Sequence, residues 1–226
     1  MHSDIREWTR LVGWVGTVAL LVLAFLRSRR HDTARQEFAD RIGGQMTSVW
    51  SFRSNPPPGS VVFRVGDWQG TLRSDVDDRR SGLRSLRVDY VIPAGHYPRC
   101  RLHHGVSVKN RALQVLTPNL FGEWKKRQVA GNAAFNEAWS LEVRDETALQ
   151  LIDGHVQSAL LQFAAWVRDQ QHGWAQIGTD GERLRITVWQ VSGGRPEQLY
   201  GFWEQSLGVL RAFAAGDAGA GTAAAH

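Results

Sequence analysis

The sequence has almost no cysteine, and it lacks the short motifs that mark common catalytic sites. Cys100 is the only cysteine in 226 residues, so no internal disulfide can form and nothing indicates an oxidising compartment. The chain contains no phosphate-binding loop of the G-x-x-x-x-G-K-[ST] type, no G-x-S-x-G, no H-E-x-x-H and no paired C-x-x-C. These absences exclude the enzyme classes that such motifs identify, although many active sites leave no local trace in a sequence.

The composition is that of a globular protein with a modest basic excess. Hydrophobic residues make up 42% and charged residues 22%, which opposes general disorder. Of the net charge of +5, residues 1–35 supply +3 through six arginines against three acidic residues. A nucleic-acid-binding protein usually concentrates its basic excess in the folded domain, so the distribution disfavours nucleic acid as a partner. The ten tryptophans are typical of interfaces as well as of cores.

An apolar run near the N-terminus predicts a single transmembrane helix. Residues 11–26 read LVGWVGTVALLVLAFL without a charge, and such a stretch is marginal but sufficient to span a bilayer when its flanks help. A core helix or a cleaved signal peptide would be the alternatives. The flanks suit the two membrane interfaces, through Trp8 and Trp14 at one end and Arg27, Arg29 and Arg30 at the other.

The flanking charges predict an orientation for this anchor. The positive-inside rule places the N-terminus outside and the main domain in the cytoplasm, as in a single-pass protein of the inner (cytoplasmic) membrane. The small residues Gly13, Gly16 and Thr17 lie where another membrane helix could pack.

The remainder of the chain predicts an α+β domain, mainly antiparallel, with two amphipathic helices. We divide the sequence into an anchor (1–30), a stalk helix with a Pro-rich linker (31–58), the cytoplasmic domain (59–215) and a flexible tail (216–226). Alternating segments such as SVVFRVGDW and LRSLRVDYVIP read as strands joined by short connections.

The C-terminal third carries the clearest pattern. Apolar residues recur at helical spacing through Thr147–Gln170, namely Leu149, Ile152, Val156, Leu160, Phe163 and Val167. Asp180-Gly181 lies between two alternating runs and predicts a hairpin, and Pro196 suits the first turn of a second helix.

This strand, helix and hairpin arrangement, from Phe135 through EVRDETALQLI to LRITVWQV, resembles a family of uncharacterised bacterial membrane-anchored proteins. The resemblance covers about a quarter of the chain and rests on apolar positions. Because that family has no established activity, the resemblance implies no catalytic residue.

Two clusters are candidate functional sites. His96, Cys100, His103 and His104 carry metal-ligating atoms, but on an extended strand Cys100 and His104 lie about 13 Å apart and His103 faces the other side. Metal binding is therefore disfavoured. Basic residues beside a tryptophan form the second cluster: Trp124, Lys125, Lys126 and Arg127. A solvated loop is the leading interpretation of this run, followed by a surface for anionic lipid or an acidic partner.

These observations predict a non-catalytic, single-pass accessory subunit of a larger bacterial membrane complex, such as a respiratory or light-harvesting assembly. We expect its partners to be other subunits and the lipid bilayer, with no nucleic acid, no cofactor and no identified small-molecule substrate. The alternatives are a membrane-tethered enzyme or metal-binding domain that uses the His96–His104 segment, and a small-ligand sensor with a cavity between the sheet and the Thr147–Gln170 helix.

Overall fold

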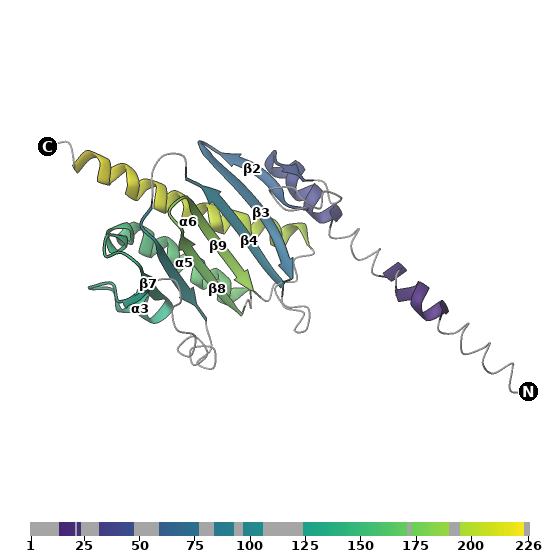
Figure 1. Ribbon diagram of the computed structural model, residues 1–226, viewed down its shortest axis with the longest axis horizontal. Helices are drawn as coiled ribbons and strands as arrows, with labels where there is room; N and C mark the ends of the chain where they lie inside the picture. The colour runs from purple at the N-terminus through teal and green to yellow at the C-terminus, as the bar shows by residue number, and fades with distance from the viewer. Residues whose placement is uncertain are drawn as a thin grey trace, which may run out of the picture.

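A single antiparallel sheet organises the chain. The computed structural model describes residues 14–20, 22–23, 32–47, 59–76, 84–92, 97–105, 124–170, 173–189 and 195–223. Within them, nine strands form one sheet in the order β1-β2-β3-β4-β9-β8-β5-β7-β6, and each neighbouring pair is antiparallel. The expectation of a mainly antiparallel β domain is confirmed (Figure 1).

The strands differ in length, and the longest lie in the first half of the chain. Their bounds are β1 (Gln45–Met46), β2 (Val61–Val65), β3 (Trp68–Val76), β4 (Arg84–Val91), β5 (Cys100–His104), β6 (Lys125–Arg127), β7 (Ser140–Val143), β8 (Trp174–Thr179) and β9 (Arg183–Trp189). Strand β8 connects the two halves of the sheet, because it pairs with β9 on one side and with β5 on the other.

Alternation along each strand separates an apolar face from a polar one. In β4, the side chains of Leu86, Val88 and Tyr90 are fully buried. The intervening residues Arg87 and Asp89 point to the opposite face, since successive side chains of a strand alternate. The same alternation in β9 buries Leu184, Ile186 and Val188.

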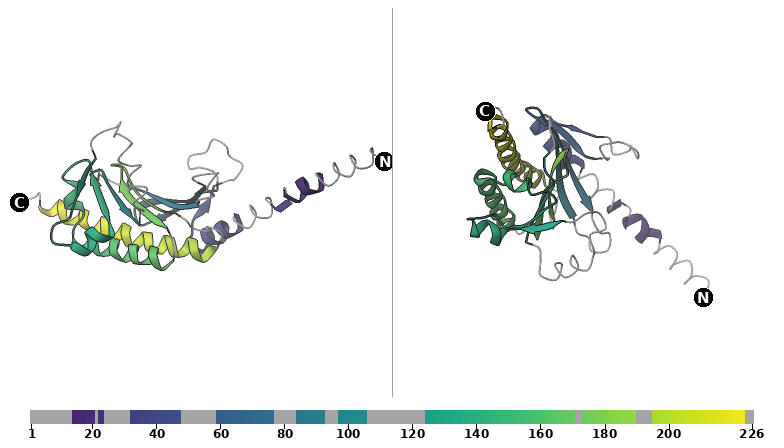
Figure 2. Two further views of the ribbon diagram at one scale, coloured as in Figure 1. Left: turned by 90° about the horizontal axis from the view of Figure 1, so that it is seen from below. Right: turned by 60° about the vertical axis from the view of Figure 1, so that its left-hand side comes forward.

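The helices cover the apolar face. They are a helix at residues 32–42 and α3 (Ala133–Ala138), α4 (Ala148–Leu151), α5 (Gly154–Asp169) and α6 (Pro196–Ala223). Figure 2 shows α5 and α6 running side by side along one side of the sheet, and none of these helices covers the other face. Tyr90 joins the two layers through a 2.7 Å hydrogen bond between its hydroxyl and that of Ser206 on α6.

The predicted helix over Thr147–Gln170 is present but interrupted. Helix α4 ends at Leu151, and α5 begins after Asp153, whose carboxylate accepts a 2.8 Å hydrogen bond from the amide of Val156. An aspartate in this position satisfies a free amide of the first turn, and it supports a new helix start that the apolar spacing alone did not indicate. The apolar stripe faces inward as predicted, with Ile152, Val156, Leu160, Phe163 and Val167 buried.

The predicted hairpin and second helix are also found. The turn between β8 and β9 contains Gly181 at a φ of 107°, a conformation that favours glycine. Helix α6 begins at Pro196 and continues to Ala223, into the stretch for which the sequence predicts a tail.

The helix at residues 32–42, predicted as a polar stalk, packs against the domain. Its Phe38 is 1% exposed and makes an edge contact with Trp203 of α6, with ring centroids 6.2 Å apart. Arg41 lies over the ring of Tyr200 at 4.2 Å. The spacing of Ala34, Phe38 and Ile42 explains this, because residues four apart share one face of a helix.

The predicted membrane anchor is wrong. No helix in the described part of the chain is long and apolar enough to cross a membrane. Of the segment predicted to span the bilayer, residues 14–20 and 22–23 are described and helical. The single-pass topology and the inner-membrane localisation with a cytoplasmic domain, which depend on this anchor, are therefore not supported.

Candidate functional site

The sheet face opposite the helices is rich in basic side chains. The alternation of buried and exposed residues, with the strand register, assigns seven basic side chains to it: Arg64, Arg73, Arg87, Arg101, Lys126, Arg183 and Arg185. The described acidic side chains that the strands contribute to this face are Asp89 and Glu142. We call this surface the open face.

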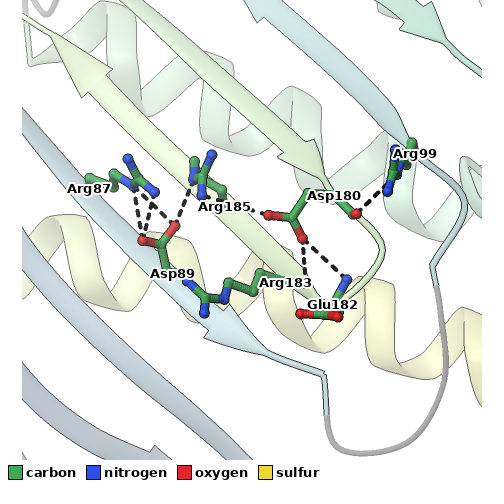
Figure 3. A network of polar contacts seen from close by, with 7 residues as sticks. All are labelled: Arg87, Asp89, Arg99, Asp180, Glu182, Arg183 and Arg185. Carbon is green, nitrogen blue, oxygen red and sulfur yellow. Dashed lines mark hydrogen bonds and ion pairs between the residues drawn. The ribbon is translucent and has the colours of Figure 1, made fainter. Parts of the chain in front are cut away.

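Asp89 lies at the centre of the open face and holds two arginines (Figure 3). Arg87 Nε donates to both carboxylate oxygens at 3.0 and 3.1 Å, and Arg185 Nε donates to Oδ1 at 2.8 Å. Asp89 is only 8% exposed, and this burial opposes its ionisation. The hydrogen bonds from Arg87 and Arg185 outweigh burial, so the pKa of Asp89 lies below its ordinary value. Its role is to fix the positions of two guanidinium groups.

Asp180 organises the adjacent β8–β9 turn. Its carboxylate accepts hydrogen bonds from the backbone amides of Glu182 and Arg183 at 3.2 and 3.0 Å. Its second carboxylate oxygen lies 3.7 Å from Arg185 Nη2, and its carbonyl accepts a 3.1 Å hydrogen bond from Arg99 Nε. The turn therefore brings Arg99 and Arg185 to the same end of the open face (Figure 3).

Gly178 lies between Arg101 and Arg185 in the sheet. In the sheet register it pairs with Arg185 of β9 on one side and with Arg101 of β5 on the other. A Cβ atom placed on Gly178 would lie 2.9 Å from the carbonyl oxygen of Cys100, so a side chain is not tolerated there without a shift. Since neighbouring strands lie about 4.8 Å apart, the backbones of the two arginines are separated by about 10 Å.

A pocket of about 370 Å³ opens at this position. It is lined by Arg99, Cys100, Arg101, Trp124, Arg144, Gln176, Gly178, Thr179, Asp180 and Arg185. Four of these residues are arginines and one is acidic. We call it the arginine pocket. A larger hollow of about 780 Å³ shares Arg99, Arg144 and Asp180 with it, but its lining also includes Asp145, Glu146 and Glu182 and is therefore more evenly charged.

Two further contacts define the walls of the arginine pocket. The guanidinium carbon of Arg101 lies 4.0 Å from the centre of the Trp124 ring, a stacked arrangement that favours a cation. Arg144 follows β7 directly, and its amide donates to the carbonyl of Arg99 at 3.1 Å. The Arg144 guanidinium makes no ion pair with any residue that the structure describes.

The basic cluster singled out from the sequence lies at the edge of this site. Lys125, Lys126 and Arg127 form the short edge strand β6, where a solvated loop was the leading interpretation. Trp124 lines the arginine pocket, and Lys126 is paired in register with Glu142 on the open face. Arg127 points elsewhere, because it is bound to Glu146 at the start of the helical region.

The histidine and cysteine cluster does not converge. Cys100 is buried on the helix side, where burial raises the pKa of its thiol despite a hydrogen bond to Thr179. His104 is on the same side, with Nδ1 2.8 Å from the carbonyl of Ala138. His103 lies on the open face, with Nε2 3.7 Å from Glu142 Oε2, so it points away from the other two as the strand geometry predicts. His96 lies outside the described residues, within which no group of metal-ligating side chains is found.

His103 affects the carboxylate next to it. The separation of 3.7 Å is longer than a hydrogen bond but short enough for an ion pair when the imidazole is protonated. His103 holds the pKa of Glu142 below its ordinary value against the opposing effect of burial, with smaller contributions from Lys126 and Arg101.

The described candidate residues of the predicted anchor, Trp14, Gly16 and Thr17, do not line the arginine pocket. Trp14 is 73% exposed, and a Cβ on Gly16 would meet nothing within 4 Å in the described part of the chain. Thr17 lies in the same helical segment. The remaining anchor and interface candidates lie outside the described residues: Trp8, Gly13, Arg27, Arg29 and Arg30.

The residues that would line the predicted sensor cavity belong to the hydrophobic core. Leu160 and Phe163 of α5, which would line a cavity against the sheet, are 0% and 1% exposed. The arginine pocket lies on the opposite side of the sheet and is polar. Sequence reasoning missed it because its arginines come from three separate strands or their ends, β5, β7 and β9. The signal that could have found them is the polar half of each alternating segment.

Comparison with family models, with curated proteins and with solved structures finds no match for this chain.

Proposed function

We propose that the domain is a non-catalytic binding module, acting as an accessory subunit, that docks an acidic protein partner on its open face. The observation that carries this proposal is the charge of the face, with seven basic side chains against Asp89 and Glu142. A surface of one sign attracts a partner of the opposite sign and sets the orientation of the encounter.

The aromatic residues of the open face support a docking role. Trp174 and Trp189, paired in register, stack with ring centroids 3.5 Å apart and are partly exposed. Tryptophan and arginine are the residue types enriched among the energetically dominant contacts of protein interfaces. Their combination on a face that no described helix covers favours a protein partner over a purely solvated surface.

The ionisable groups with shifted pKa values support a binding role over a catalytic one. Tyr90 and Cys100 have raised pKa values because both are buried in the core. Asp89 is ionised and held between two arginines. In each case the perturbation is explained by packing or by a structural ion pair, which is the common non-catalytic cause of such shifts.

The proposal is tested by charge reversal on the two sides of the domain. Arg64 and Arg183 are exposed on the open face, whereas Arg168 and Arg211 are exposed on the helix layer. We expect R64E/R183E to weaken binding of poly-L-glutamate to the full chain about tenfold, and R168E/R211E, with the same change in net charge, to weaken it less than twofold. Equal losses in the two variants, measured by titration calorimetry, would contradict a docking face.

A photo-crosslinking amino acid identifies the partner. Placed at Thr71 on the open face, it should yield one discrete adduct in the native cells, and R64E/R183E should abolish that adduct. The matched probe at Gln162, exposed on α5, should yield none. An adduct formed only from Gln162, or a Thr71 partner without an acidic surface, would overturn the proposal.

A further inference from the structure

We infer that the arginine pocket is a binding site for a phosphoryl group, the dianionic phosphate of a small ligand. This inference goes beyond the proposed function, because it requires no protein partner. The class of ligand follows from the charge of the pocket, from the way its arginines are held and from its size.

The pocket has more positive charge than its own side chains neutralise. Its lining holds Arg99, Arg101, Arg144 and Arg185 against the carboxylate of Asp180. Counting Asp89 behind Arg185 as a second counter-charge still leaves two positive charges unbalanced. Glu142 lies beside Arg101 in the register but is matched by Lys126 on its other side. A phosphoryl group carries a charge of about −1.5 to −2 at neutral pH, which fits this excess better than a single carboxylate does.

The arginines on either side of Gly178 are oriented before any ligand binds. Arg185 is held by Asp89 at 2.8 Å and lies 3.7 Å from Asp180. Arg101 is stacked on Trp124 at 4.0 Å. Ordering a long side chain opposes binding, and these two arginines are already ordered in the folded protein. Two guanidinium groups fixed on opposite sides of an anion can each donate two parallel hydrogen bonds.

The absence of a side chain at Gly178 leaves room for the ligand. Its cross-strand neighbours place a guanidinium on either side, and the space between them would be occupied by any larger residue. A pocket of about 370 Å³ falls in the range of small-molecule sites. Gln176, on the same strand and face, adds an amide that can hydrogen-bond a phosphate oxygen.

The test is calorimetric titration of the full chain with sodium pyrophosphate and with inorganic phosphate at low ionic strength. We expect one site per chain, and about tenfold weaker binding in each of R101Q and R144Q, neither of which breaks an ion pair that the structure describes. R64Q and R168Q remove the same charge outside the pocket and should change the affinity less than twofold. In NMR spectra of the backbone amides, pyrophosphate should shift the signal of Gly178 and leave the signals of α5 unchanged.

Several results would overturn the inference. If the pocket variants and the control variants bind pyrophosphate equally weakly, the anion is attracted diffusely to a basic protein. If millimolar pyrophosphate gives neither a heat of binding nor a shift of the Gly178 amide signal, there is no site. Tighter binding of free glutamate than of phosphate would assign the pocket to carboxylates. A ten-nucleotide oligothymidine that binds far more tightly than pyrophosphate, and that depends on Trp174, would assign the face to nucleic acid. The first three results leave the crosslinking from Thr71 unaffected, so failure of this inference is distinguishable from failure of the docking proposal. An oligothymidine site on the face would contradict both proposals.

Discussion

At the scale of single residues, Asp89 holds two arginines of the open face in position. Its side chain is 11% exposed and pairs with those of Arg87 and Arg185, which are 21% and 41% exposed. Breaking a fully buried pair costs about 3–5 kcal/mol, but water screens the more exposed Arg185. We therefore expect D89N to lower the free energy of unfolding by roughly 2 kcal/mol, measured by urea denaturation at pH 7.

The same residue predicts a pH dependence. Because the folded-state pKa of Asp89 is lowered, its ionised form stabilises the fold above its unfolded pKa of about 3.9. This stability is lost as the pH falls from about 4 through the lower folded value. The wild type should lose stability over that interval more steeply than D89N. Parallel curves for the two proteins would show that folding does not lower the pKa of Asp89.

At the scale of elements, α5 holds the helix layer on the sheet. Leu160 is 0% exposed, and its carbonyl accepts a 3.0 Å hydrogen bond from Trp139 Nε1. L160A deletes buried methyl groups and leaves a cavity, so we expect a loss of about 2–5 kcal/mol in the free energy of unfolding. The control Q162A, two residues away on the exposed side of the same helix, should change it by less than about 0.5 kcal/mol. An unchanged melting temperature in L160A would place the stripe outside the core.

The elements that the sequence predicted correctly are those coded by local patterns. The apolar stripe of α5, the turn at Asp180-Gly181 and the helix start at Pro196 each depend on a few neighbouring residues, and all three are present. The break between α4 and α5 was missed, because the same spacing of apolar residues continues across it. Asp153 was the available signal, since an aspartate three residues before a buried valine can cap a helix.

Most residues of the candidate site could not be predicted from local sequence patterns. The sequence indicated Trp124 and Lys126 because they belong to a run of basic residues beside a tryptophan. The structure places both at the edge of the open face. Arg101, Arg144 and Arg185 were not selected, because they are far apart in the sequence and meet only through the register of β5, β7, β8 and β9. The predicted membrane anchor failed for a related reason: an uncharged run meets the compositional rule for a spanning segment, while no described helix is both long and apolar enough to cross a membrane.

At the scale of the whole molecule, the two proposed ligands share one surface. The arginine pocket lies over β5, β8 and β9, near the middle of the strand order. A bound phosphoryl dianion would cancel the two unbalanced charges of the pocket and weaken the attraction of the face for an acidic chain. Small-ligand binding and partner docking should therefore oppose each other.

This coupling gives a prediction that neither proposal makes alone. Saturating pyrophosphate should weaken binding of poly-L-glutamate about fivefold relative to sodium chloride at the same ionic strength, because general screening is then equal and only occupancy of the pocket differs. In R101Q/R144Q the two salts should act alike, since the pocket no longer holds the dianion. Binding of both ligands to the wild type without mutual interference, measured in the same titrations, would place the docking area elsewhere on the open face, towards Arg64 and Arg73 on β2 and β3.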